Sequence, residues 1–477
     1  MKEVAMADAV KEILDALDNS LQIQKGAVKV SNPSKLREKV QKLAEISALG
    51  SGEKQGIARY LTRVAALELG IIPASIHDLY MARGRGDVPT TFTVPAINLR
   101  ALSFDAARII FRVAQSIDGA ALIFELARSE MGYTDQRPSE YTTSVLAAAI
   151  AEGYKGPVFI QGDHFQVSAK KYAANSAAEV QTVEDLIKES IAAGFFNIDV
   201  DTSTMVDLDK PTVPEQQALN TELSARLTAH IRKIEPKGVT ISVGGEIGEV
   251  GGRNSTEEEL RAYVEGFKRD LNKLGTGMTG LSKISIQTGT SHGGVALPDG
   301  SIAKVKVDFE TLRHLSQVAR RDYNMAGAVQ HGASTLPEDA FGKFVETETC
   351  EIHLATGFMN QLFDRMPDAL RDQMYAYLRD KHASERKGDM TDEQFYYKVR
   401  KNAVGPFKAQ SWALPPSVKE AVGKDWEAQF RKLFYLLGVK GTRQYVEKWI
   451  KPVVVQPNLK DYLGEKAGIE SVSDLAD

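Results

Sequence analysis

Eight short β-rich runs alternate with amphipathic helical stretches between Thr91 and about Gly357, and this alternation constrains the fold more than any other feature. The runs are FTVPAINL (92–99), GAALIFELA (119–127), PVFIQGD (157–163), FFNIDVDTS (195–203), VTISVGGEIG (239–248), KISIQTG (283–289), AGAVQHGAS (326–334) and CEIHLAT (350–356). The helical stretches between them include 103–115, 140–152, 176–193, 215–234, 256–274 and 308–321. Eight such units predict an α/β fold in which parallel strands close into a (β/α)8 TIM barrel. The alternative is an open doubly wound sheet, but INLRALSF after the first run is not the Gly-rich phosphate fingerprint that such a sheet would carry.

The segments on both sides of the barrel have a helical pattern. Apolar residues keep helical spacing early in the chain, as at Val10, Ile13 and Leu17. We therefore predict a helical N-terminal extension (1–90), the barrel (91–375) and a helical C-terminal extension (376–477). Late in the chain, one apolar stripe predicts a surface that packs against the barrel or another subunit. The stripe consists of Trp426, Phe430, Leu433, Phe434 and Leu437.

Composition excludes several classes of function. The formal charge of −4 over 477 residues gives no reason to expect nucleic acid or an anionic membrane as partner. A single cysteine, Cys350, excludes an intrachain disulfide framework and a thiolate metal cluster. The N-terminal segment lacks the uninterrupted apolar region of a signal peptide, and no stretch approaches the roughly 18 apolar residues of a membrane span. We therefore expect a soluble, cytoplasmic protein.

Four of the eight histidines fall at or just beyond the ends of predicted strands. They are His164, His292, His331 and His353. In a barrel these strand ends surround one mouth, where catalytic sites are built. Three imidazoles that converge from separate strands are the ligand set of an open zinc site. The other histidines lie in helical or charged segments, where a surface position explains them.

Gly-rich turns and acids accompany these histidines. GTSHGG (289–294) and QHGAS (330–334) allow backbone N–H groups to bind an anion. Asp199 and Asp201 are two residues apart on a strand and share a face, and Glu246 follows SVGG. A metal beside an anion cradle indicates a phosphorylated substrate with an oxygen for the metal to polarise.

A Schiff-base mechanism would need a lysine that projects from a strand into the pocket. Lys283 is the only lysine in the predicted strands, and it stands at the N-terminal end of its strand, away from the mouth. The sequence therefore favours metal chemistry over imine chemistry.

Over roughly residues 90–375 the chain resembles the class II, metal-dependent ketose-bisphosphate aldolases. The resemblance is carried by GDH (162–164), DTS (201–203), EIGEVGG (246–252), GTSHGG, QHGAS and HLAT (353–356) in the family's order and spacing. It implies a carbon–carbon lyase of carbohydrate metabolism, glycolysis included. The enzyme would cleave or condense a phosphorylated ketose, such as a fructose or tagatose bisphosphate, through a zinc-stabilised enediolate.

The same resemblance implies residue roles. One Zn²⁺ per chain would bind His164, His292 and His331, with Glu246 and Asp201 as neighbouring or alternative ligands. Asp163 would transfer the substrate hydroxyl proton. The phosphate cradle would consist of Gly293, Gly332, Ser334 and Thr356, and a monovalent cation could bind at Gly293 and Ser334.

Three positions depart from the family pattern. Gly244 and Asn254 stand where family members usually carry acids, and His353 replaces an asparagine that contacts substrate. We expect His353 to contact the substrate and Glu249 to supply the missing enolisation acid, with Glu257, Glu258 and Glu259 as alternatives.

A second likeness leaves other functions open. FELARSEMGYTDQRPSEY (124–141) and GVKGTRQYVEKWI (438–450) look like parts of the accessory subunit of tagatose-bisphosphate aldolases. The alternatives are therefore a non-catalytic subunit that stabilises an aldolase, or a related lyase for another sugar acid or a sulfonated sugar. We expect a homo-oligomer.

Overall fold

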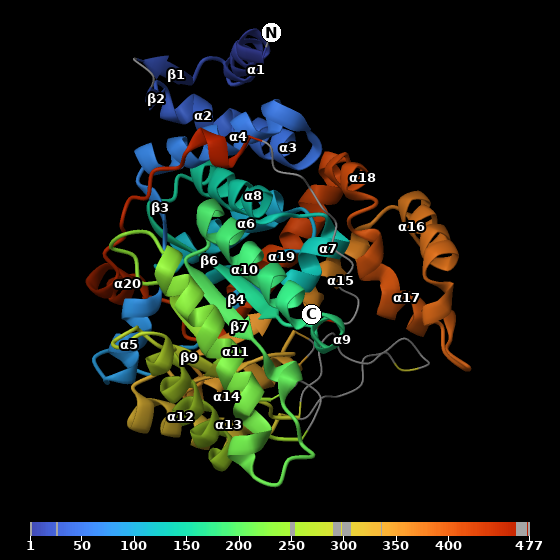
Figure 1. Cartoon of the computed structure of the whole chain (residues 1–477). Helices are drawn as coiled ribbons and strands as arrows, with labels where there is room; N and C mark the ends of the chain where they lie inside the picture. Colours follow the sequence, from blue (N-terminus) through green and yellow to red (C-terminus); the bar gives the residue numbers. More distant parts are fainter. Residues whose placement is uncertain are drawn as a thin grey trace.

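The computed structural model describes residues 2–24, 27–248, 253–289, 297, 307–334, 336–463 and 475. Eight parallel strands form a closed barrel in which each strand pairs with the next along the chain and the last pairs with the first (Figure 1). They are β4 (Val94–Asn98), β5 (Ile123–Ala127), β6 (Gly156–Gln166), β7 (Asn197–Asp201), β8 (Ser242–Glu246), β9 (Lys283–Ser285), β10 (Ala328–Gln330) and β11 (Glu351–Leu354). Every strand except β6 lies within its predicted run, and the predicted (β/α)8 barrel is confirmed.

Helices follow the strands and cover the outside of the barrel. They are α6 (Ser103–Ser116), α7 (Arg128–Thr134), α8 (Pro138–Ala151), α9 (Ala169–Ala174), α10 (Ser176–Ala193), α11 (Val213–Ile234), α12 (Glu257–Leu274), α13 (Phe309–Tyr323), α14 (Phe341–Glu346) and α15 (Thr356–Arg365). The local sequence explains where α12 begins, because Thr256 and Glu259 form a reciprocal capping box. The same helix buries Leu260 and Phe267 on its apolar face, which gives the barrel an outer hydrophobic layer.

Strand β6 continues past Asp163 and His164, so our prediction that it ends there is wrong. Gly162 pairs with Ile198 and Phe165 with Val200, which leaves two residues of β6 opposite one residue of β7. This extra residue is a β-bulge, and His164 adopts the left-handed backbone conformation with φ +41°. Adjacent side chains of a regular strand point to opposite faces. The bulge allows Asp163 and His164 both to lie buried in the barrel.

The N-terminal extension packs mainly against α8 on the outside of the barrel, and its last helix reaches the N-terminal ends of the strands. It contains α1 (Lys2–Ala16), β1 (Leu21–Gln24), β2 (Ala27–Val30), α2 (Pro33–Lys39), α3 (Gln41–Leu49), α4 (Gly52–Glu68), β3 (Ile71–Ala74) and α5 (His77–Gly84). The helical prediction did not include the three short strands, of which β3 pairs with the first half of β6. From α5, Arg83 donates to the carbonyl oxygens of Phe92 at 2.6 Å and Ala326 at 3.2 Å. These bonds fix α5 across the N-terminal ends of the strands.

The C-terminal extension packs on the barrel through the predicted apolar stripe. It contains α16 (Asp368–Lys381), α17 (Asp392–Val399), α18 (Lys408–Trp412), α19 (Pro416–Leu436) and α20 (Arg443–Trp449). On α19 the Trp426 indole donates to the Phe358 carbonyl oxygen at 3.0 Å, and the rings of Phe430 and Phe358 lie 4.6 Å apart. The prediction of a packing surface is therefore confirmed. Within the described part of the chain, none of the helices has both the length and the apolarity of a membrane span.

Candidate active site

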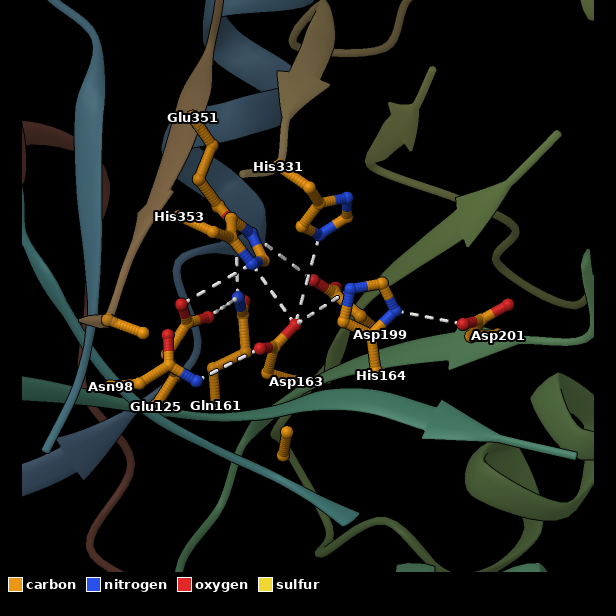
Figure 2. Close-up of polar contacts among 12 residues, drawn as sticks. Asn98, Glu125, Gln161, Asp163, His164, Asp199, Asp201, His331, Glu351 and His353 are labelled. Carbon is orange, nitrogen blue, oxygen red and sulfur yellow. Dashed lines mark hydrogen bonds and ion pairs between the residues drawn. The ribbon is translucent and has the colours of Figure 1, made fainter. Parts of the chain in front are cut away.

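A group of acids and imidazoles lies at the C-terminal mouth of the barrel, on strands β6, β7 and β8 and just after β10. We call it the mouth cluster; its members are Asp163, His164, Asp201, Glu246 and His331. Figure 2 shows four of its members, Asp163, His164, Asp201 and His331. His164 Nδ1 lies 2.8 Å from Asp201 Oδ2 and 3.3 Å from Glu246 Oε2. The rings of His164 and His331 lie 4.2 Å apart between centroids. The barrel thus brings together side chains that are far apart in the sequence.

Burial and neighbouring charges control the ionisation of the mouth cluster. Burial alone would raise the pKa of Asp163, but the positive charges of His164 and His353 hold that pKa well below its usual range. Burial alone would lower the pKa of His164, but Asp163 and Glu246 raise it well above the usual value. Burial, followed by the charge of Asp201, raises the pKa of Glu246 to about 7. Asp163 is therefore available as a carboxylate, whereas Glu246 favours its neutral form up to about pH 7, and a further positive charge nearby would stabilise its carboxylate.

The donor atoms of the mouth cluster fit a metal ion. Asp163, His164 and His331 can each offer one ligand atom, and these atoms lie within 4.8 Å of one another. His164, Asp201 and Glu246 form a second such group. Imidazole nitrogens and carboxylate oxygens are ligands that zinc accepts at about 2.0–2.2 Å. These residues would hold the metal, and the expected third histidine, His292, lies outside the described residues.

A second polar group lies deeper in the barrel, and we call it the interior cluster. Its members are Glu125, Gln161, Asp199, Lys283, Glu351 and His353. Lys283 Nζ lies 2.9 Å from Asp199 Oδ2 and also contacts Glu351. His353 connects the two clusters, because its Nε2 lies 2.7 Å from Glu351 Oε1 and its Nδ1 lies 3.1 Å from Asp163 Oδ1 (Figure 2).

Lys283 is buried at the start of β9, and its side chain extends into the barrel interior. Burial alone would lower its pKa, but Asp199 and Glu351 raise the pKa above the usual value. A Schiff base requires a neutral amine. The ion pairs of Lys283 therefore agree with the sequence argument against imine chemistry.

A cavity of about 310 Å³ opens beside the mouth cluster. It is lined by Asn98, Arg100, Asp163, His164, His331, Gly332, Ser334, His353, Ala355 and Thr356. Gly332 has φ +69°, and Ser334 Oγ accepts a bond from the Ala355 amide at 2.5 Å. Thr356 begins α15, so the first-turn amides of a ten-residue helix lie at the cavity wall. Glycine turns and helix N-termini bind anions, which suits a phosphate group.

Three residues that the sequence pattern did not predict hold Asp163 and the cavity wall in place. Asn98 donates to Asp163 Oδ2 at 3.0 Å and to Glu130 Oε2 at 2.9 Å. Arg100 donates to Glu130 Oε1 at 2.6 Å and to Thr356 Oγ1 at 3.2 Å. Asn98 ends β4, so the rule that polar strand ends face the mouth would have found it.

The predicted site residues are placed as follows. Asp163, His164, Asp201, Glu246 and His331 form the mouth cluster, whereas Gly332, Ser334, His353 and Thr356 line the cavity. Glu249, His292 and Gly293 lie outside the described residues.

At one of the three departures from the family pattern, Asn254, the side chain supports the start of α13. Asn254 donates to Asp308 Oδ2 at 2.9 Å, and Asp308 caps α13. Among the alternative acids, Glu257 pairs with Arg261 and Glu259 belongs to the capping box of α12. The carboxyl groups of Glu257 and Glu259 therefore make contacts within the first turns of α12.

Known proteins show what the chain is similar to. Residues 89–411 match the family model described as fructose-bisphosphate aldolase class-II. No curated protein sequence matches the chain significantly. The fructuronate-tagaturonate epimerase UxaE from Cohnella laeviribosi has a similar structure, with a TM-score of 0.51, 12% identity, and coverage of 88% of this chain and 90% of that one. The fructose-bisphosphate aldolase from Campylobacter jejuni aligns with a TM-score of 0.43 and 16% identity, over 78% of this chain and 97% of that one. For the YdjI aldolase from Escherichia coli K12 the TM-score is 0.43 and the identity 12%, over 78% and 99% of the two chains.

Proposed function

The chain belongs to the class-II fructose-bisphosphate aldolase family, and from this premise we propose that it is a metal-dependent aldolase that cleaves or condenses a phosphorylated ketose. One observation carries the proposal: the Asp163 carboxylate lies between the imidazoles of His164 and His331 and a cavity that ends at a helix N-terminus. His164 Nε2 and His331 Nε2 lie 3.9 and 3.8 Å from Asp163 Oδ1. This arrangement supports a role for Asp163 as the acid/base group beside a metal that would act as the electrophile.

We assign the metal site to zinc, one ion per chain, held by His164 and His331 together with His292. When bound, the metal would polarise the ketone oxygen and stabilise the negative charge that develops on it, an effect worth several kcal/mol. Glu246 and Asp201 would neighbour the ion. Their carboxyl groups are buried beside each other, so a cation would be stabilised in this region.

Asp163 would accept the substrate hydroxyl proton as the carbon–carbon bond breaks, and it would return that proton during condensation. Asn98 and His353 hold its two oxygens, so the carboxylate is oriented before substrate arrives. Gly332, Ser334 and Thr356 would hold the phosphate, together with Gly293. Glu249 remains our assignment for the enolisation step.

Epimerisation of a ketose acid is the second candidate function, favoured by the pairing of His353 with Asp163. Both residues line the cavity from different strands, so two proton-transfer groups lie beside one reacting centre. Cleavage of a bond, rotation of the aldehyde and condensation on its other face would give the epimer by the same chemistry. The named activity of the structurally similar Cohnella enzyme is of this kind.

The test is turnover by the purified chain alone. We would incubate it with ketose monophosphates, ketose bisphosphates and ketose acids, with and without chelator, and measure aldehyde release and epimer formation. An aldolase releases aldehyde only when metal is present. An epimerase that works by cleavage forms the epimer and retains the hydrogen on the epimerised carbon in deuterated water. An accessory subunit would turn over none of these compounds, and that result would contradict the proposal.

A further inference from the structure

The centre of the barrel contains an ammonium group that the proposed chemistry does not use. Lys283 Nζ donates to Gln161 Oε1 at 2.8 Å and to Asp199 Oδ2 at 2.9 Å, and it also donates to Glu351 Oε1. The residue is 0% exposed. A buried charge with three acceptors is fixed in place, because each bond offsets part of its desolvation cost.

A chain of contacts leads from this ammonium to the proposed proton-transfer group. Glu351 Oε1 receives the Lys283 bond and lies 2.7 Å from His353 Nε2. The other ring nitrogen, His353 Nδ1, lies 3.1 Å from Asp163 Oδ1. Figure 2 shows the His353 ring between Glu351, which is drawn above it, and Asp163, which is drawn below it. The orientation of the His353 ring therefore depends on where Glu351 is held.

The space around Lys283 is filled on its remaining side. A Cβ atom at Gly244 would lie 2.3 Å from Asp199 Oδ1 and 2.8 Å from Lys283 Cε. Strand β8 must therefore carry glycine here for the ion pair of Lys283 and Asp199 to fit. The Lys283 ammonium therefore packs in space that any side chain at position 244 would occupy.

We propose that Lys283 is a positioning residue for Asp163, acting through Glu351 and His353. This inference rests on the proposed function of Asp163. Without the ammonium, no lysine would offset the negative charges of Asp199, Glu351 and the nearby Glu125 in the barrel interior. The carboxylates would separate, and His353 would follow Glu351 away from Asp163. A misplacement of about 1 Å beside a reacting group can cost about 100-fold in rate.

Lys283→Met tests the proposal, since it keeps an unbranched side chain of nearly the same length and removes its charge. We expect kcat to fall about 10–100-fold, as is typical when a supporting partner of an active site is lost. KM and the zinc content should stay close to the wild-type values. A crystal structure of the zinc-loaded variant should show His353 Nδ1 beyond hydrogen-bond distance of Asp163. An unchanged kcat with His353 in its original place would overturn the proposal.

Gly244→Ala provides a second variant if Lys283→Met fails to fold. Its methyl group displaces Asp199 and Lys283 without removing a charge, so kcat should fall in the same direction but by less. Gly342→Ala on α14 is the matched control, because no atom lies within 4 Å of its added Cβ. Equal kcat values for the two glycine variants would overturn the proposal.

The positioning role of Lys283 can be tested even if the proposed aldolase activity is wrong. If the wild type turns over none of the sugars, the aldolase assignment fails. The separation of His353 and Asp163 in Lys283→Met still decides whether the lysine positions the carboxylate.

Discussion

The mouth cluster and the interior cluster contain similar acids, but they differ in where their positive charge comes from. The acids of the mouth cluster pair with imidazoles, which carry charge only when they are protonated. The interior cluster has its own permanent cation, Lys283. The pKa values follow this difference: burial and Asp201 raise the pKa of Glu246 to about 7. Burial also acts on Glu351, but Lys283 and His353 hold its pKa at about 2.

Asp199 shows that one ammonium does not neutralise two buried acids equally. Burial raises its pKa to about 6 even though Lys283 acts to lower it, because the charge of Glu351 opposes its ionisation. The single ammonium of Lys283 thus stabilises the carboxylate of Glu351 more than that of Asp199. The mouth cluster is balanced only when a cation or protons are added, as expected of a site that binds a metal.

The largest effect is expected from removing the ligands of the mouth cluster. His164→Ala and His331→Ala should each lower the bound zinc from about one ion per chain to near zero, because an open zinc site has about three protein ligands. Turnover should fall to background. Metal analysis of the purified variants checks this. His314→Ala is the control, since His314 is an exposed histidine on α13. Full zinc occupancy in both variants would show that the site is misassigned.

Asp163→Asn should separate proton transfer from metal binding. The amide keeps the size of the side chain but accepts no proton, so cleavage should slow by about 10²–10⁴-fold. The zinc content should remain close to one ion per chain. Exchange of the α-hydrogen of the ketone product with solvent should be less affected, because it depends on another group. A variant that loses zinc and turnover together would assign Asp163 to the metal instead.

Hydrophobic periodicity predicted the barrel and nearly all of its strands, because each strand is a short apolar run between turn residues. The bulge at His164 escaped prediction, since a histidine in the left-handed conformation has no sequence signature. Strand β3 was also missed. Its four residues gain their pairing from β6, far along the chain, and local pattern does not reveal such a partner.

The candidate site divides in the same way. Polar residues at strand ends indicated Asp163, His164, Asp201, Glu246 and His331 at the mouth, because parallel strands end at one face. The interior cluster was not predicted. Glu125 and Glu351 lie within buried strands, and Lys283 starts a strand at the far end of the barrel. The long side chain of Lys283 reaches these acids across the barrel interior, and that contact exists only when the barrel is closed.

A buried acid outside both clusters, Glu140, tests whether a nearby lysine offsets the cost of burying a carboxylate, because the protein's stability should then depend on pH. Glu140 lies 3.0 Å from Lys408 and 3.9 Å from Arg59, yet burial raises its pKa to about 7. Since the folded protein binds this proton more tightly than the unfolded chain, stability falls as pH rises from about 4.5 to about 7. Glu140→Gln stays neutral and should lack this loss. The unfolding free energy of the variant minus that of the wild type should therefore rise by on the order of 3 kcal/mol between pH 4.5 and 8.

Urea unfolding at several pH values measures this difference. Glu38→Gln, at an exposed position, is the control for the general effect of removing an acid. A difference that stays constant with pH would mean that the ion pair with Lys408 fully compensates the burial of Glu140.

The smallest effect is expected at the connection between the interior cluster and the N-terminal extension. The Tyr80 hydroxyl on α5 donates to Glu351 Oε2, and the residue is 1% exposed. Tyr80→Phe leaves that carboxylate oxygen buried with one bond fewer, which should cost about 2 kcal/mol of unfolding free energy. Tyr435→Phe, at a tyrosine that is 50% exposed, should change stability little and serves as the control. The zinc content of Tyr80→Phe should equal that of the wild type, because Lys283 still balances Glu351 and the mouth cluster is not contacted. Loss of zinc from this variant would show that the two clusters form one electrostatic unit, and the distinction between them would then fail.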